Sequence, residues 1–188
     1  MARPRSEDRR NAIMGAAARV IASQGLSAPT SLIAKEAGVS NGSLFTYFET
    51  KADLLNQLYV ELKTEMASAA LDEVPTDKDI RHQMASMWSG WLRWAIADRN
   101  KRRTLAQLAV SDEITGTSRE IGRRAMTGVS EILERSRENG PMRAAPLGLV
   151  AGLMNAAADA TVEFIILDPV NAESHSRAGF EAMWRMIA

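Results

Sequence analysis

The chain has 188 residues, of which 46% are hydrophobic and 24% charged, so it is long enough for one or two globular domains and is not a disordered protein. It contains no cysteine, which excludes a disulfide framework or a thiolate metal site and suits a reducing compartment such as the cytoplasm. The net charge is zero, but residues 1–51 carry seven basic and four acidic side chains, a net charge of +3, which fits a region that faces phosphate.

The N-terminal segment is basic and polar. Residues 1–5 either form an arm whose arginines, Arg3 and Arg5, reach the minor groove of DNA or remain a disordered terminus, and the second interpretation is favoured. They include no apolar core of a signal peptide. The longest uncharged stretch, 144–158, is too short and too rich in Ala and Gly to span a bilayer. We therefore expect a cytoplasmic protein without membrane contact.

A first helix is predicted from Ser6, a suitable N-cap, to Gly25, a suitable terminator. Glu7 and Asp8 fall in its first turn, where the helix dipole favours negative charge. Apolar residues recur at helical spacing and form one face that supports the helices that follow. They are Ile13, Ala16, Ala17, Val20 and Ile21.

The stretch 30–51 is predicted to form two short helices joined by a tight turn, with Pro29 in the first turn of the first helix. Gly38 can end that helix in the left-handed conformation, and Ser40 can cap the next one. Leu44 and Phe48, four residues apart, hold the second helix to the core. Its outward face has no carboxylate and offers hydroxyl and amide groups suited to the major groove of DNA, from Asn41, Gly42, Ser43, Thr46 and Tyr47. The alternative is a helical hairpin within a larger bundle.

The run IAKEAGVSNGSLFTYFETKADLL, Ile33 to Leu55, resembles the helix-turn-helix signature of the tetracycline-repressor-like (TetR) transcriptional regulators, and the resemblance extends back through 9–25. It implies an N-terminal domain that binds operator DNA as part of a homodimer, and a C-terminal domain in which a small ligand releases that DNA. It also implies that Thr30, Ser31 and Lys51 contact the DNA backbone. The predicted DNA-binding residues are Thr30, Ser31, Ser40, Asn41, Gly42, Ser43, Phe45, Thr46, Tyr47 and Lys51.

Two of these positions depart from the family pattern. Asn41 stands where a lysine is frequent, and it can read adenine but adds no charge. Phe45 stands where a tyrosine is common, so a phosphate contact at that position would lack one hydrogen bond. The operator sequence therefore stays open.

The remainder of the chain reads as further helices. Thr50 can cap a helix that runs to Leu71, with Asp53 completing a capping box, and this helix links the two expected domains. Further helices are predicted at 79–97, 102–110, 118–139, 145–167 and 172–187. Gly140 and Pro141 are expected to end the helix 118–139. The predicted fold is all-α with about nine helices, divided into a helix-turn-helix domain, 1–50, and a C-terminal helical bundle domain, 51–188.

Tryptophan and methionine are abundant in the C-terminal part. Core packing is the favoured interpretation, because such stripes at helical spacing are usually buried. The alternative is an adaptable cavity for a small apolar or aromatic molecule, since thioethers repack around varied shapes and indoles stack on flat ones. The candidate ligand-binding residues are Met84, Met87, Trp88, Trp91, Met126, Met154 and Asn155.

The helix 145–167 is apolar nearly all the way round, as expected of a helix that is central to its domain or shared with a second chain. Small residues recur on it every four positions. The TetR resemblance implies a four-helix dimer interface built from the last two long helices of each subunit. The predicted interface residues are Gly148, Gly152, Ala156, Ala160, Phe180 and Trp184.

Side chains that could support catalysis are sparse. His82 and His175 have no second ligand one helical turn away, so no metal site is predicted. Asp159 and Glu163 lie one turn apart, where paired carboxylates fit the edge of the interface or of the pocket better than acid–base work. With no catalytic residues and no cofactor, we expect a ligand-responsive, homodimeric regulator, most simply a repressor released from a palindromic operator. The alternatives are a helical interaction module without DNA binding and a small hydrolase or lyase.

Overall fold

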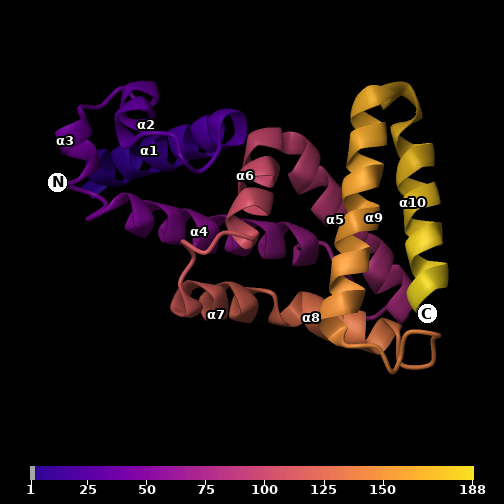
Figure 1. Ribbon diagram of the computed structural model, residues 1–188. Coiled ribbons are helices and arrows are strands. Elements are labelled where there is room, and N and C mark those ends of the chain that lie inside the picture. The colour runs from indigo at the N-terminus through magenta and orange to yellow at the C-terminus, as the bar shows by residue number, and fades with distance from the viewer. Residues whose placement is uncertain (1–2) are drawn as a thin grey trace. The chain divides into compact units, whose positions relative to one another are not determined.

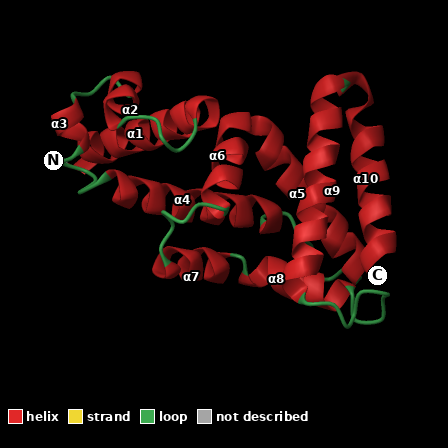
Figure 2. Cartoon of the chain, in the orientation of Figure 1, coloured by secondary structure: helices red, strands yellow, loops and turns green. Residues whose placement is uncertain are grey.

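The computed structural model describes residues 3–188, with side chains from Ser6 onward, and every regular element in that range is a helix (Figures 1 and 2). This confirms the all-α prediction, although the described residues form ten α-helices rather than about nine. They are α1 Arg3–Gln24, α2 Thr30–Glu36, α3 Asn41–Leu44, α4 Lys51–Leu71, α5 Ile80–Ala97, α6 Arg99–Ala109, α7 Gly116–Ala125, α8 Thr127–Ser136, α9 Leu147–Leu167 and α10 Ala172–Ile187, with a 3₁₀ turn at Pro169–Asn171.

By packing, the chain divides into two compact units. One contains the residues up to Thr64 together with 98–124, and the other contains 65–97 and 125–188. The first boundary between the two units along the chain, after Thr64, thus falls inside α4. The predicted division into domains 1–50 and 51–188 stays a prediction.

The start of α1 differs from the prediction. The helix begins at Arg3, so Ser6 lies within it and is not its N-cap. Pro4 suits the first turn of a helix, where its missing N–H has no intrahelical partner, and this favours the earlier start. Met1 and Ala2 of the predicted basic arm lie outside the described residues, and the side chains of Arg3 and Arg5 are not described either. At its other end α1 stops as predicted, with Gly25 at φ +82°.

The first unit is built on the apolar face of α1, which packs against α2 and α6. Ile13, Ala17 and Ile21 are fully buried. Two side chains of α6 bind the backbone of α1: the buried Thr104 hydroxyl donates to the carbonyl of Ala18 at 2.7 Å, and the Gln107 amide donates to that of Ile21 at 3.2 Å. These bonds fix α1 as the support for α2 and α3.

The second unit is a bundle of α5, α8, α9 and α10 with the last turns of α4, and its core is rich in Met and Trp. Two glycines allow the closest helix contacts. A Cβ added at Gly90 of α5 would lie 2.2 Å from the backbone oxygen of Ala69 in α4, and one added at Gly179 of α10 would lie 2.2 Å from the hydroxyl of Thr161 in α9. Both positions therefore require the absence of a side chain.

The predicted single helix 118–139 is wrong, because the chain forms α7 and α8 with a break at Met126. Each of the two helices approaches α4 closely at a glycine: a Cβ at Gly122 would lie 2.9 Å from the Tyr59 ring, and one at Gly128 would lie 2.9 Å from a Leu71 methyl. The two helices thus approach different stretches of α4. Ile121 of α7 is exposed.

The end of α8 also differs from the prediction, since the helix stops at Ser136. The buried guanidinium of Arg137 donates to the carbonyl oxygens of Met142 at 2.8 Å and Ala145 at 2.5 Å, and pairs with Glu134 at 2.7 Å. These bonds hold the segment 142–145, which follows Gly140 and leads into α9, against the end of α8.

The helix α9 is long and apolar enough, by length and composition, to cross a membrane. One of its sides is nevertheless part of the core of the second unit, where Val150, Met154, Ala158, Val162 and Ile165 are buried. It is therefore a core helix of the second unit and not a membrane span.

The close contact at Gly90 generates a prediction about stability. Gly90→Ala should lower the free energy of unfolding by about 1–3 kcal/mol, because the added methyl meets backbone that cannot move aside. Urea denaturation measures this. Gly116→Ala is the matched control: nothing lies within 4 Å of a Cβ at that position, so stability should stay equal or rise by less than about 1 kcal/mol. Equal stability of the two variants would contradict the contact.

Candidate functional site

The first candidate site is formed by α2, α3 and the start of α4 in the first unit. The sequence shapes it as predicted: Gly38 takes φ +69° directly after α2, and Ser40 caps α3 by accepting a hydrogen bond from the Ser43 N–H at 3.0 Å. Leu44 and Phe48 are fully buried, as is Ile33 of α2. The regular part of α3 spans only four residues, and hydrogen-bonded turns continue it as far as Phe48.

The predicted outward face is exposed. Asn41, Gly42, Phe45 and Thr46 are exposed and Ser43 and Tyr47 are half-buried, with Phe45 presenting 42% of its surface to solvent. Between Ala37 and Phe48 there is no acidic side chain. The outward side chains of this segment are thus not buried against their own unit, whereas the helical-hairpin alternative would bury them.

The hydroxyl groups of this face are ordered by local bonds. Ser40 donates to the Ser43 hydroxyl at 2.9 Å, and Thr46 donates to the Ser43 carbonyl at 2.7 Å. The Ser43 hydroxyl keeps its own hydrogen for a further acceptor, while Thr46 keeps an acceptor lone pair. The side chains of Asn41 and Tyr47 form no hydrogen bond with another described residue. The face can therefore donate to phosphate oxygens and pair with base edges.

Lys51 follows at the first residue of α4, half-buried, and Thr30 and Ser31 lie in the first turn of α2. The start of α4 is fixed by a reciprocal cap in which the Asp53 N–H donates to the Thr50 hydroxyl at 3.0 Å and the Glu49 N–H donates to the Asp53 carboxylate at 3.1 Å. This confirms the predicted capping box, except that the carboxylate receives the N–H one residue before the cap.

Arg10 is a positioning residue that the sequence pattern does not reveal. Arg10 of α1 donates to Glu61 at 3.0 Å and to Gln57 at 3.1 Å, both on α4, and its guanidinium lies 5.8 Å from the centre of the Phe48 ring. It therefore joins three elements of the site. An arginine on the polar side of α1 is an ordinary surface residue by pattern, so no local signal could have singled it out.

Few charged groups of the first unit are perturbed. Glu36 of α2 is paired with Arg19 of α1 at 2.8 Å. The groups with a shifted pKa belong to other parts of the unit: burial raises the pKa of Tyr59 and lowers that of Lys63, and hydrogen bonds from Arg123 and Arg124 lower that of Glu120.

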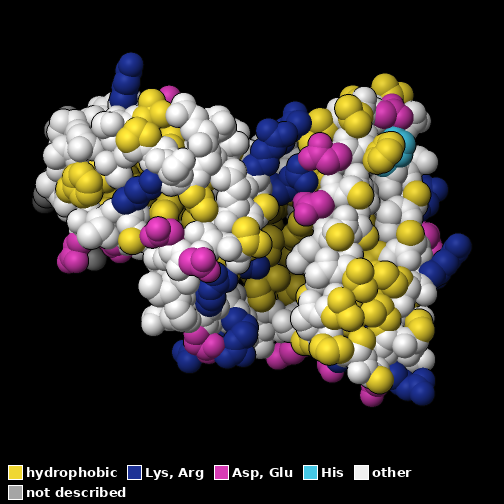
Figure 3. Space-filling model, in the orientation of Figure 1, with side chains coloured by type: hydrophobic (Ala, Val, Ile, Leu, Met, Phe, Trp, Pro, Cys, Tyr) yellow, Lys and Arg dark blue, Asp and Glu magenta, His cyan; other side chains and the backbone are white. Residues whose placement is uncertain are grey.

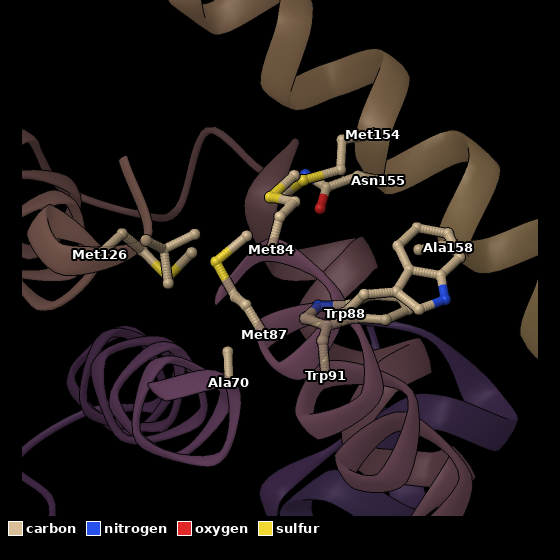
Figure 4. A pocket seen from close by; sticks show the side chains of 10 residues that line it. Ala70, Met84, Met87, Trp88, Trp91, Met126, Met154, Asn155 and Ala158 are labelled. Carbon is tan, nitrogen blue, oxygen red and sulfur yellow. The ribbon is translucent and has the colours of Figure 1, made fainter. Parts of the chain in front are cut away.

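The second candidate site is a small pocket within the second unit that opens partly to the solvent. Figure 4 shows side chains from several helices converging on this space. All seven side chains predicted for a ligand cavity line it, together with three small apolar ones that the prediction missed. The lining comprises Ala70, Met84, Met87, Trp88, Trp91, Met126, Val129, Met154, Asn155 and Ala158.

Core packing and cavity lining are not exclusive here. Met84, Met87 and Trp88 are buried members of the hydrophobic core and also face the pocket. Ala158 lies one helical turn after Met154, so helical spacing could have found it, whereas Ala70 belongs to a distant helix that only the fold brings close.

The residues predicted for a dimer interface are divided by the structure. Gly148, Gly152, Ala156 and Ala160 of α9 are exposed, and nothing lies within 4 Å of a Cβ added at either glycine. Large apolar side chains flank them in the open, and Figure 3 shows hydrophobic side chains gathered over α9 and α10. They are Leu149, Leu153, Phe164 and Leu167.

The two predicted interface aromatics of α10 are placed differently from this stripe. Phe180 is buried in the chain's own core, with its ring centre 6.4 Å from that of Trp88, while Trp184 is half-buried and stacks on Phe180. Phe180 is therefore covered by its own chain before any partner arrives.

The histidines take part in local pairs. His82 contacts Asp79 at 2.8 Å, and His175 contacts Asp168 at 2.9 Å, where hydrogen bonds from Asn171 and His175 hold the pKa of the Asp168 carboxyl below its usual value. Within residues 3–188 no group of three or more potential ligands is arranged to hold a metal ion.

The chain is similar to known proteins in both sequence and fold. Residues 13–58 match the sequence model of the family described as bacterial regulatory proteins, tetR family. The chain is 25% identical to a protein from Shewanella sp. PV-4 assigned to the tetR family of transcription regulators, over 94% of this chain and 96% of that one, with a TM-score of 0.81.

Two further solved structures share the fold over nearly the whole length. A TetR family transcription regulator from Marinobacter aquaeolei VT8 is 22% identical, over 97% of this chain and 96% of that one, with a TM-score of 0.85. The TetR-like regulator LfrR from Mycobacterium smegmatis, solved in complex with proflavine, is 19% identical over 96% and 98%, with a TM-score of 0.69.

The tie made by Arg10 predicts a difference between two interhelical ion pairs. Arg10→Met should lower the free energy of unfolding by about 1 kcal/mol, because it removes two hydrogen bonds to α4 and the contact with Phe48. Arg19→Met, which breaks the more exposed pair with Glu36, should cost less than about 0.5 kcal/mol. Chemical denaturation of both variants makes the comparison, and an equal loss would show that Arg10 is an ordinary surface arginine.

Proposed function

The chain belongs to the TetR family of DNA-binding transcriptional regulators, and on that premise we propose that it is a repressor that binds a palindromic operator as a homodimer and is released by a small apolar or aromatic effector. The family is one of regulators and not of enzymes, which confirms the expectation that the chain is neither a hydrolase nor a lyase. The observation that carries the proposal is the exposed, carboxylate-free face of α3 beside Lys51.

In the proposed complex, α3 enters the major groove of DNA. Asn41 and Ser43 would contact base edges, while Thr30, Ser31, Tyr47 and Lys51 would contact the backbone. A reading element of this kind is presented twice by a dimer, with about 34–36 Å between the two copies so that both enter successive major grooves. The exposed Phe45 adds an apolar surface that suits a thymine methyl group or the sugar backbone.

Homodimerisation would use the exposed stripe of small residues on α9 and the flanking leucines. Gly148 and Gly152 leave open backbone surface, which lets a second helix come close, and Leu149 and Leu153 supply apolar area around it. An exposed apolar face of this kind on a core helix is typical of a protein interface.

The proposed effector would bind in the pocket of the second unit. The helix α4 begins with Lys51 at the DNA-binding face and carries Ala70, which lines the pocket, in its last turn. A ligand that displaced this end of α4 would act on the helix that bears Lys51. It can release DNA only to the extent that it binds the DNA-incompetent state more tightly.

The alternative from another class is a helical interaction module without DNA binding. It is tested together with the proposal by incubating the purified protein with fragmented DNA of its own genome, sequencing the retained fragments and repeating the binding over a range of salt concentrations. The proposal expects a shared palindromic sequence and affinity that falls steeply with salt. Retention without any shared sequence, or no retention, would favour the alternative.

Two classes of contact predict different mutational effects. Lys51→Ala and Tyr47→Ala should weaken binding to all DNA sequences alike, and Lys51→Ala should reduce the salt slope by about one. Asn41→Ala should instead relax the preference at one base pair, by about 1–3 kcal/mol. Gel-shift series with cognate and scrambled DNA measure both. Lys78→Ala, which removes the same charge from a loop of the other unit, is the control, and an effect equal to that of Lys51→Ala would refute the assignment.

The proposed dimer predicts a charge-sensitive position on α9. Gly152→Glu should convert the protein to a monomer in sedimentation equilibrium at micromolar concentration, because it places a charge in an apolar contact. Gly116→Glu also introduces a glutamate at an exposed glycine, but on α7, and should leave the oligomeric state unchanged. A dimer that survives Gly152→Glu would place the interface elsewhere.

A further inference from the structure

Resting on the proposed role of the pocket as the effector site, we infer the chemical class of its ligand: an uncharged, flat aromatic molecule with a hydrogen-bond acceptor that receives the indole N–H of Trp91. Three properties of the pocket lead to this class. They are the absence of charge in its lining, one buried donor without a partner, and the combination of indole and thioether walls.

The lining is uncharged. None of the ten described residues that form the pocket is acidic or basic, and nine of them are Ala, Val, Met or Trp. A cation or carboxylate that entered would lose its hydration with no opposite charge in the wall to replace it. The pocket therefore selects against anions, and a cation would find only the indole faces of Trp88 and Trp91 in place of a charged partner.

The lining has few polar groups, and they differ in whether they already have a hydrogen-bond partner. The indole of Trp88 donates to the backbone carbonyl of Ser176 at 3.3 Å, so its hydrogen is already bonded. The indole nitrogen of Trp91 is buried and has no hydrogen-bond partner among the described residues. A buried donor left unpaired is costly, and a ligand acceptor that pairs with it removes this cost.

Asn155 is the remaining polar group of the lining, and it lies at an exposed position of α9. Water can reach its amide when the pocket is empty, so it does not share the need of Trp91 for a partner. The acceptor that distinguishes a good ligand from a poor one is thus the one that meets Trp91.

The walls favour a flat shape. Trp88 and Trp91 offer aromatic surfaces, on which planar rings pack by offset stacking or edge contacts. The thioethers of Met84, Met87, Met126 and Met154 are flexible and polarisable, and they adjust to the outline of such a ring system. A rigid planar molecule also loses little conformational freedom on binding.

The chain itself offers a matched control. Trp94 lies in the same helix, and its indole nitrogen is likewise buried without a partner among the described residues, but Trp94 does not line the pocket. Trp91→Phe and Trp94→Phe therefore remove the same kind of group from the same helix, and only the first removes it from the pocket.

The test uses four three-ring probes of similar outline: fluorenone, which has a carbonyl acceptor, fluorene, which lacks it, fluorene-9-carboxylate, an anion, and proflavine, a cation. Equilibrium dialysis with the full-length protein measures the dissociation constants. Fluorenone should bind about tenfold more tightly than fluorene, the difference expected of one additional hydrogen bond, and at least about tenfold more tightly than either ion.

Trp91→Phe should abolish the preference for fluorenone over fluorene while leaving the affinity for fluorene within about twofold, and Trp94→Phe should retain the preference. The inference is overturned if the preference survives Trp91→Phe, if either ion binds as tightly as fluorenone, or if none of the probes binds. Circular dichroism melting of both variants checks that they fold, and a Trp91→Leu variant, which also lacks a donor, replaces Trp91→Phe if the latter does not.

Failure of the inference and failure of the proposed function remain distinguishable. Release of the genome-selected DNA by fluorenone is measured separately by gel shift. Binding with the stated preference but without release would support the ligand class and refute the effector role. Release by a charged compound that displaces fluorenone would support the effector role and refute the ligand class.

Discussion

The surface proposed to face DNA depends on the burial of two side chains. A regular helix of only four residues has no stability of its own, since nucleation costs more than so few hydrogen bonds return. Leu44 and Phe48, both fully buried, fix α3 to the unit, and Ser40 closes its first turn. The packing of Leu44 and Phe48 therefore fixes the orientation of the outward side chains between Asn41 and Tyr47. The rigidity of the surface therefore belongs to α1, α2 and α4 and not to the element that would enter the groove.

The helix ends between α1 and the start of α4 could be predicted because residues that cap or end helices act locally. Gly25, Gly38, Ser40 and Thr50 each act within a few residues of their own position, and the structure places each where its chemistry indicates. The break at Met126 differs from the single helix that was predicted, and the helices on either side of it approach Tyr59 and Leu71, more than fifty residues earlier. The early start of α1 and the tie made by Arg10 likewise depend on weak or distant signals.

Only the fold shows which apolar residues of the second unit pack in the core, which line the pocket and which stay exposed. Periodicity marks Met84, Trp88 and Phe180 as inward-facing, but it cannot say whether a partner helix, a cavity or a second chain covers them. In the structure Phe180 is covered by its own chain, whereas Met84 and Trp88 contribute to both the core and the pocket. The small residues of α9 remain uncovered, and only their spacing of four could be read from the sequence.

The composition of that α9 stripe has a consequence for association. Glycine and alanine have no side-chain rotamers to lose, so a surface made of Gly148, Gly152, Ala156 and Ala160 is already ordered before anything docks on it. Most of the usual entropic penalty of immobilising long side chains is absent there. A helix that settles against this strip can thus gain from the removal of water at nearly full value, even over a small area.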